Sequence, residues 1–133
     1  MNISHQVTEA IGRDLQFICH RASLAAGWWP SEDLRQIDEG TRLGKLIVSQ
    51  KLLLTHGELG EATEGLRKGV MDEHLPHRLN FEVELADAVI RIFDLAGACR
   101  LDLGAAIAEK MAYNAQRADH KPEARAAAGG KSF

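Results

Sequence analysis

The sequence predicts an all-α protein built as a four-helix-type bundle. Apolar residues recur at intervals of three and four over four long segments, which is the spacing of an amphipathic helix. No segment shows the sustained alternation of a β-strand, and β-branched residues are sparse. The only three prolines, Pro30, Pro76 and Pro122, fall outside those four segments. Helices with short connections bury their apolar faces by packing together as a bundle.

The length of 133 residues predicts a single domain. We place this domain at residues 1–118, followed by a mobile tail at residues 119–133 that is rich in Ala, Gly and Lys. A small helical chain often completes its burial by pairing with copies of itself. The broadly apolar helices therefore predict a homo-oligomer, either a homodimer or a homotetramer.

The first helix is predicted at residues 7–25, and the Gly-Trp-Trp-Pro-Ser sequence at residues 27–31 interrupts its pattern as a loop. Ser31 is a candidate cap for a short turn after that loop. The longest helix is predicted at residues 41–68. Gly69 suits its C-terminal end, because glycine adopts the left-handed conformation without strain.

The second half of the chain contains two more predicted helices. Residues 71–79 include a proline and read as a connection. A helix follows at residues 80–100. Asp102 is then a candidate N-cap for a last helix that runs to about residue 118.

The charge balance limits the classes of partner. The chain has 16 Lys and Arg against 19 Asp and Glu, a formal net charge of −3. No excess of positive charge is available to neutralise a nucleic-acid polymer. A small anionic substrate remains compatible if a metal ion supplies local positive charge.

Features of location and redox state are few. Cys19 and Cys99 have no metal-ligand spacing and are expected to be buried free thiols. We recognise neither a signal peptide nor an apolar run long enough to cross a membrane. The expectation is a cytoplasmic protein without a membrane partner.

Two predicted helices carry acidic pairs at the same spacing. Glu58 and Glu61 lie on the helix at residues 41–68, and Glu84 and Asp87 lie on the next helix. A separation of three residues places both members of a pair on one helix face, about 60° apart. Two antiparallel helices would gather these four carboxylates in one pocket, where they repel one another unless a cation lies between them. Oxygen ligands of this kind suit Mg²⁺, or alternatively Mn²⁺.

Periodicity favours a site over a solvated helix face, which is the usual explanation of an isolated acidic pair. Apolar side chains cover roughly 220° of the helix at residues 80–100, at 100° per residue. Glu84, Asp87, Arg91 and Asp94 share the narrow remaining stripe, which must face water or a site. Asp94 is expected to support the ligands rather than to bind the ion.

The preceding helix gives the same indication. Glu58 and Glu61 continue a face that is apolar or lines a site. Glu64, one step further along, is either another ligand or an exposed neighbour. The face that the two acids continue carries Ile47, Lys51 and Leu54.

The last predicted helix supplies donors for an anion. Lys110 and Asn114 continue the row of core-facing residues, and Arg117 lies at its edge. Cationic and amide donors in such a row can meet phosphate oxygens. The alternative is that Lys110 only extends its charge to solvent and Arg117 pairs with an exposed acid.

The tryptophan pair in the first loop has two interpretations. Trp28 or Trp29 can stack on a nucleobase, and we include Trp29 among the candidate substrate-binding residues. A tryptophan pair in a loop more often anchors that loop to the core or to an interface.

Together these residues resemble the MazG-like all-α nucleoside triphosphate pyrophosphohydrolases. The motifs Glu58-x-x-Glu61, Glu84-x-x-Asp87 and Lys110-x-x-x-Asn114-x-x-Arg117 occur in the family's order, with Lys51 upstream of the first. The resemblance covers roughly residues 45–117, whereas the first forty residues match the family pattern poorly.

The resemblance implies Mg²⁺-dependent hydrolysis of a ribo- or deoxynucleoside triphosphate between the α- and β-phosphates, which gives the monophosphate and pyrophosphate. Glu58, Glu61, Glu84 and Asp87 would bind Mg²⁺ and form the catalytic group, with one carboxylate as a possible base. The substrate would be held by a second set of side chains. That set comprises Lys51, Lys110, Asn114, Arg117 and Trp29.

Three alternatives remain at the level of the sequence. The first is a non-catalytic or regulatory bundle that binds nucleotides without turnover, although such a protein has no need of four carboxylates. The second is a di-iron carboxylate bundle, which would need Glu-x-x-His pairs that are not in register here. The third is a plain helical interaction module, which would bind no metal.

Overall fold

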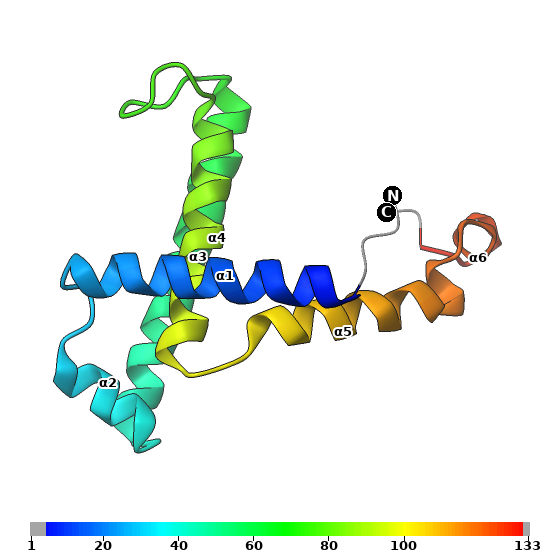
Figure 1. The fold of residues 1–133 in the computed structure, drawn as a ribbon. Helices are drawn as coiled ribbons and strands as arrows, with labels where there is room; N and C mark the ends of the chain where they lie inside the picture. Colours follow the sequence, from blue (N-terminus) through cyan, green and yellow to red (C-terminus); the bar gives the residue numbers. More distant parts are fainter. Residues whose placement is uncertain (1–4, 132–133) are drawn as a thin grey trace. The chain divides into compact units, whose positions relative to one another are not determined.

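The computed structural model describes residues 5–131, and these residues form an all-α protein without a β-strand. Six α-helices and one 3₁₀ helix follow one another along the chain, as Figure 1 shows. The prediction of an all-α fold is confirmed, but the count of four helices was too low. Their bounds are α1 (His5–Ala25), α2 (Ser31–Asp38), α3 (Arg42–Lys68), α4 (Asn80–Ala98), α5 (Leu103–Gln116), η1 (Ala118–His120) and α6 (Pro122–Ala126).

Three helix ends have the capping residues that the sequence predicts or supplies. The Thr41 hydroxyl accepts a hydrogen bond from the Gly44 amide at 3.0 Å at the start of α3. Gly69 ends the same helix in the left-handed conformation, with φ of 64°. The Asp102 carboxylate accepts from the Ala105 amide at 3.0 Å and caps α5.

Other predicted boundaries require correction. Ser31 is the first residue of α2 rather than its cap, and Pro30 occupies the cap position without a side-chain hydrogen bond. Helix α4 ends at Ala98, not at residue 100, because Arg100 turns to a φ of 54°. Helix α5 ends at Gln116, since Arg117 is extended.

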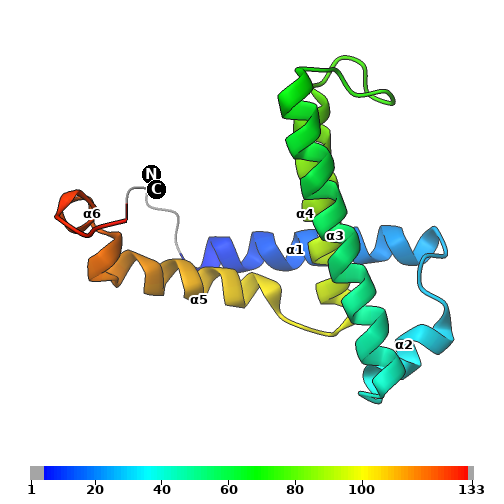
Figure 2. The same cartoon turned by 180° about the vertical axis from the view of Figure 1, so that it is seen from behind.

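The chain divides into two compact units. The first comprises residues 15–101 and contains α2, α3, α4 and the end of α1 from Leu15. Helices α3 and α4 pack along each other and α2 packs on α3. The α3–α4 pair lies side by side in Figure 1 and again in Figure 2, joined by the loop at residues 69–79. Trp29, Leu95 and Ala98 form its buried cluster.

The second unit comprises residues 5–14 and 102–131 among the residues described. Within it, Arg13 Nε donates to Asp102 Oδ2 at 3.0 Å. A Cβ added to Gly12 would lie 2.5 Å from the Cα of Gly104, so glycines allow the backbones of α1 and α5 to touch there. Helices η1 and α6 cover residues 119–120 and 122–126 of the tail predicted at residues 119–133. The single domain and the mobility of that tail stay predictions.

Helix α4 buries part of its polar stripe and exposes much of its apolar surface. Glu84 is buried and Asp94 is half-buried, whereas several apolar side chains are 40–46% exposed. A sequence-only expectation would place the apolar side in the core. The exposed members of that face are Leu85, Val89, Ile90 and Ile92.

No helix within residues 5–131 combines the length and the apolar character that crossing a membrane requires.

Candidate metal and nucleotide site

Three acidic side chains converge between α3 and α4. Glu58 comes from α3, while Glu84 and Asp87 come from α4. One carboxylate oxygen of each lies within 4.8 Å of the others. The spacing of three residues puts both α4 acids on the face that packs against α3. The predicted meeting of the two acidic motifs therefore occurs for three of the four carboxylates.

Glu84 is the most deeply placed acid of this cluster, with 8% of its surface exposed. Asn80 Nδ2 donates to Glu84 Oε1 at 2.9 Å. Burial, followed by hydrogen bonding with Glu58 and the nearby charge of Glu61, raises the pKa of Glu84. A carboxylate in this position is stabilised by an added cation.

Asp87 is more exposed to solvent than Glu84, and its surroundings likewise raise its pKa. Partial desolvation, and then the charge of Glu58, raise the pKa of Asp87, while Arg91 opposes them. Glu58, whose side chain is 12% exposed, forms an ion pair with Arg91. One cationic side chain thus faces a group of three carboxylates.

Glu61 and Glu64 lie at the edge of the cluster. Glu61 is exposed, and it is close enough to Glu84 for its charge to raise the pKa of that residue. Glu64 instead pairs with its own helix, 2.7 Å from Arg67 Nε and 3.0 Å from Lys68 Nζ. The hydrogen bond from Arg67 lowers the pKa of Glu64 to about 2. Glu64 was predicted to be either another ligand or an exposed neighbour, and this arrangement agrees with the exposed neighbour.

The donor set fits a hard divalent cation. Glu58, Glu84 and Asp87 each offer an oxygen ligand, with these oxygens within 4.8 Å of one another, and the charge of Glu61 acts on Glu84. Burial first, and then the neighbouring carboxylates, raise the pKa of both Glu84 and Asp87. No imidazole or thiolate belongs to this group of three, so oxygen-preferring ions such as Mg²⁺ or Mn²⁺ suit it better than Zn²⁺.

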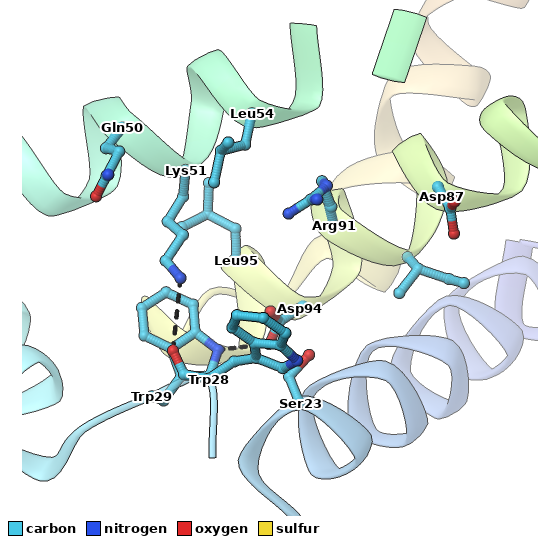
Figure 3. A pocket seen from close by; sticks show the side chains of 11 residues that line it. Ser23, Trp28, Trp29, Gln50, Lys51, Leu54, Asp87, Arg91, Asp94 and Leu95 are labelled. Atoms are coloured by element: carbon cyan, nitrogen blue, oxygen red, sulfur yellow. Dashed lines mark hydrogen bonds between the residues drawn. The ribbon is translucent and has the colours of Figure 1, made fainter. Parts of the chain in front are cut away.

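A cavity of about 560 Å³ opens beside the cluster. Asp87 and Arg91 line one part of it, and the Trp28–Trp29 loop lines another (Figure 3). Leu54 and Leu95 contribute apolar wall. This volume lies in the range of small-molecule sites.

Lys51 and Trp29, both predicted substrate contacts, meet in this cavity. Lys51 Nζ lies 4.4 Å from the centroid of the Trp29 ring and 3.5 Å from the carbonyl oxygen of Trp28. Trp29 is 6% exposed and packs with Leu95, so it anchors the loop to the core as the alternative interpretation proposed. Trp28 is 68% exposed. Substrate binding by Lys51 and Trp29 stays a prediction.

The predicted phosphate-binding residues lie in the other compact unit. Lys110 is exposed, with Nζ 4.7 Å from the centroid of the Tyr113 ring. Asn114 Oδ1 is buried and has no hydrogen-bond partner among residues 5–131. Arg117 Nη2 lies 2.6 Å from Asp119 Oδ2, which agrees with the alternative that Arg117 pairs with an exposed acid. A role for these residues in binding substrate stays a prediction.

Sequence reasoning did not assign four residues that shape the cluster. Asn80 and Arg91 each lie four residues from an α4 acid, and this helical spacing was a usable signal. Asp72 is buried and accepts the amides of His74 and Leu75 at 2.9 Å and 2.8 Å. The charges of Asp72 and His74 both act on Asp87. The proximity of Asp72 and His74 to Asp87 depends on the path of the loop at residues 69–79. The sequence of this loop has no periodic pattern from which its path could be predicted.

Comparison with protein-family models, curated proteins and solved structures gave no match, so the resemblance to MazG-like enzymes rests on the motif residues themselves.

Proposed function

We propose that the protein is a Mg²⁺-dependent nucleoside triphosphate pyrophosphohydrolase. In this proposal Glu58, Glu61, Glu84 and Asp87 hold Mg²⁺, with Mn²⁺ as a possible substitute. One water is consumed, the bond between the α- and β-phosphates breaks, and the products are the monophosphate and pyrophosphate.

The observation that carries the proposal is the convergence of the two acidic motifs. Glu58 lies 26 residues or more from Glu84 and Asp87 in the sequence, yet their oxygens approach within 4.8 Å. Acids with no function in common would lower their repulsion by turning apart on the surface. Here burial and mutual repulsion raise the pKa of Glu84 instead.

Each part of the site has a definite task in this reaction. Bound Mg²⁺ supplies positive charge for the triphosphate and lowers the pKa of a water. Asn80 orients Glu84 through its 2.9 Å hydrogen bond, and Arg91 orients Glu58. A carboxylate that is not committed to the ion accepts the proton of the attacking water.

The substrate is held by residues outside the acidic cluster. Lys51 lies at the cavity beside Trp29, where its ammonium group can donate to an oxygen of the nucleotide. Lys110, Asn114 and Arg117 are assigned to further phosphate or sugar oxygens. The unpartnered Oδ1 of Asn114 is an acceptor that suits a sugar hydroxyl.

The proposal includes a homodimer or homotetramer in the cytoplasm. Exposed leucine and isoleucine side chains on α3 and α4 support self-association, because pairing with another copy would remove apolar surface from water. Both cysteines are free thiols, as in proteins of a reducing compartment.

The test is pyrophosphate release from a panel of ribo- and deoxynucleoside triphosphates with Mg²⁺. Glu61→Gln and Asp87→Asn remove a charge from the proposed ligands with little change of shape. We expect each to lower kcat/KM by on the order of a hundredfold or more. Glu82→Gln is the matched control, because Glu82 lies on α4 but pairs with Arg78 at the surface.

Two results would contradict the proposal. Pyrophosphate release that survives both substitutions would show that another site is responsible. Binding of Mg²⁺ and nucleotide by a folded protein that releases no pyrophosphate would favour the non-catalytic nucleotide-binding bundle.

A further inference from the structure

We propose that the cavity beside the acidic cluster binds a nucleobase that carries an exocyclic amino group, and that Asp94 recognises this group. The inference rests on the proposed nucleotide substrate and adds a base preference to it. Asp94 would be a specificity-determining residue with no part in the hydrolytic chemistry.

The cavity has the layout of a nucleotide site. Asp87 belongs both to the acidic cluster and to the cavity lining, so one part of the cavity adjoins the proposed metal site. Asp94 lies seven residues further along α4, about 10 Å at the rise of an α-helix. A phosphate placed at Asp87 would therefore leave its base near Asp94.

Asp94 is held in a fixed position at that end. Trp29 Nε1 donates to Asp94 Oδ1 at 2.8 Å, and His20 Nδ1 lies 2.8 Å from the same oxygen. Figure 3 shows the hydrogen bond from Trp29 to Asp94. The Asp94 side chain is only 14% exposed, and it lines the cavity. Both contacts fall on Oδ1, so within the described chain Oδ2 stays available to a ligand.

The surroundings of Asp94 select a flat ligand that donates hydrogen bonds. Trp28 is 68% exposed and lines the cavity, so its ring offers a stacking surface. An ionised carboxylate accepts hydrogen bonds and donates none. An amino group satisfies it, whereas a carbonyl oxygen at the same place would face it without a proton between them. Gln50, also on the lining, can donate or accept at another edge of the ring.

The experiment uses matched bases that differ at one position. Dissociation constants of CMP and UMP for the full chain are measured by calorimetry, and kcat/KM is measured for CTP and UTP with Mg²⁺. We expect cytosine to be favoured on the order of ten- to a hundredfold, because the hydrogen bond to a charged acceptor is lost in uracil. AMP and IMP form the corresponding purine pair.

Substitution of Asp94 tests the assignment. Asp94→Asn keeps an acceptor for Trp29 but adds an amide donor, so the cytosine-to-uracil ratio should fall to about one or below. Asp14→Asn, at an exposed position of α1, should leave the ratio at the wild-type value. Trp28→Ala should weaken CMP and UMP alike.

The outcomes separate this inference from the proposed function. Equal binding of CMP and UMP by the wild-type protein overturns the inference, even if Asp94→Asn does not fold. Pyrophosphate release without a preference for amino-bearing bases also overturns it and leaves the proposed function standing. An Asp94-dependent preference in binding without pyrophosphate release supports the inference and rejects the proposed function.

Discussion

At the scale of one residue, Glu84 shows how a buried carboxylate of the proposed metal site can lower the stability of the fold. The pKa of this side chain is raised above its ordinary value of 4.5, first by burial and then by its acidic neighbours. Between the unfolded and the folded pKa of Glu84, the folded protein therefore binds more protons than the unfolded chain. The contribution of Glu84 to the free energy of unfolding is fully present at pH values below 4.5 and is lost as the pH rises through its folded-state pKa. Asp87 contributes in the same direction.

The corresponding prediction concerns Glu84→Gln without Mg²⁺. Gln keeps an acceptor for Asn80 and removes the titrating charge, so at pH 8 the variant should be more stable than wild type by on the order of 1 kcal/mol. The difference should disappear near pH 4, where wild-type Glu84 is protonated. Thermal and urea unfolding at both pH values, with a metal chelator present, measure it.

Addition of Mg²⁺ provides the control. Because only wild type retains the full set of carboxylates, Mg²⁺ should raise its melting temperature more than that of Glu84→Gln. An identical response of both proteins to Mg²⁺ would show that Glu84 is not a ligand. Other carboxyls, such as Glu64, have a lowered pKa and lose stability in acid, so the comparison must be made between the two proteins at each pH.

At the scale of the element, local sequence rules account for most helix positions. Thr41, Gly69 and Asp102 mark helix ends through capping chemistry that is visible in the sequence. The acidic spacing on α4 likewise predicted which side chains share a face. The partial burial of that face did not follow from the sequence. Apolar periodicity predicts which residues share a helix face but not which face contacts the core. The two short helices, α2 and α6, lack the length that makes a periodic pattern visible.

The cap at Gly69 leads to a prediction about α3. Its φ of 64° is unstrained for glycine but costs about 1 kcal/mol or more for a residue with a Cβ. Gly69→Ala should therefore lower the free energy of unfolding by that amount, as measured by urea denaturation. Gly69→Asn should cost less, because asparagine tolerates the left-handed region. Equal losses for Ala and Asn would contradict the prediction, because a Cβ at position 69 meets no other described residue within 4 Å and only the backbone conformation distinguishes the two variants.

At the scale of the whole molecule, the exposed apolar surface is the basis of the predicted self-association. Leu46 and Leu53 on α3 are 57% and 69% exposed. Gly57 and Gly60 follow on the same helix face, and a Cβ added to either would meet nothing within 4 Å. Leucine side chains next to glycine give a surface on which another helix can approach closely. Apolar periodicity in the sequence predicts an amphipathic helix but not the surface that covers this face, because that surface is set by tertiary and quaternary contacts.

We therefore expect sedimentation equilibrium to give a dimer or tetramer at micromolar concentration, and Leu53→Glu to shift it toward monomer. A buried glutamate in an apolar interface loses solvation without gaining a partner, which disfavours association by several kcal/mol. Leu75→Glu is the matched control, because it adds the same charge at an exposed leucine of the loop, away from α3. If Leu53→Glu associates as wild type does, the leucine–glycine face of α3 is not the interface. A wild-type protein that stays monomeric would instead leave the acidic cluster to function within one chain.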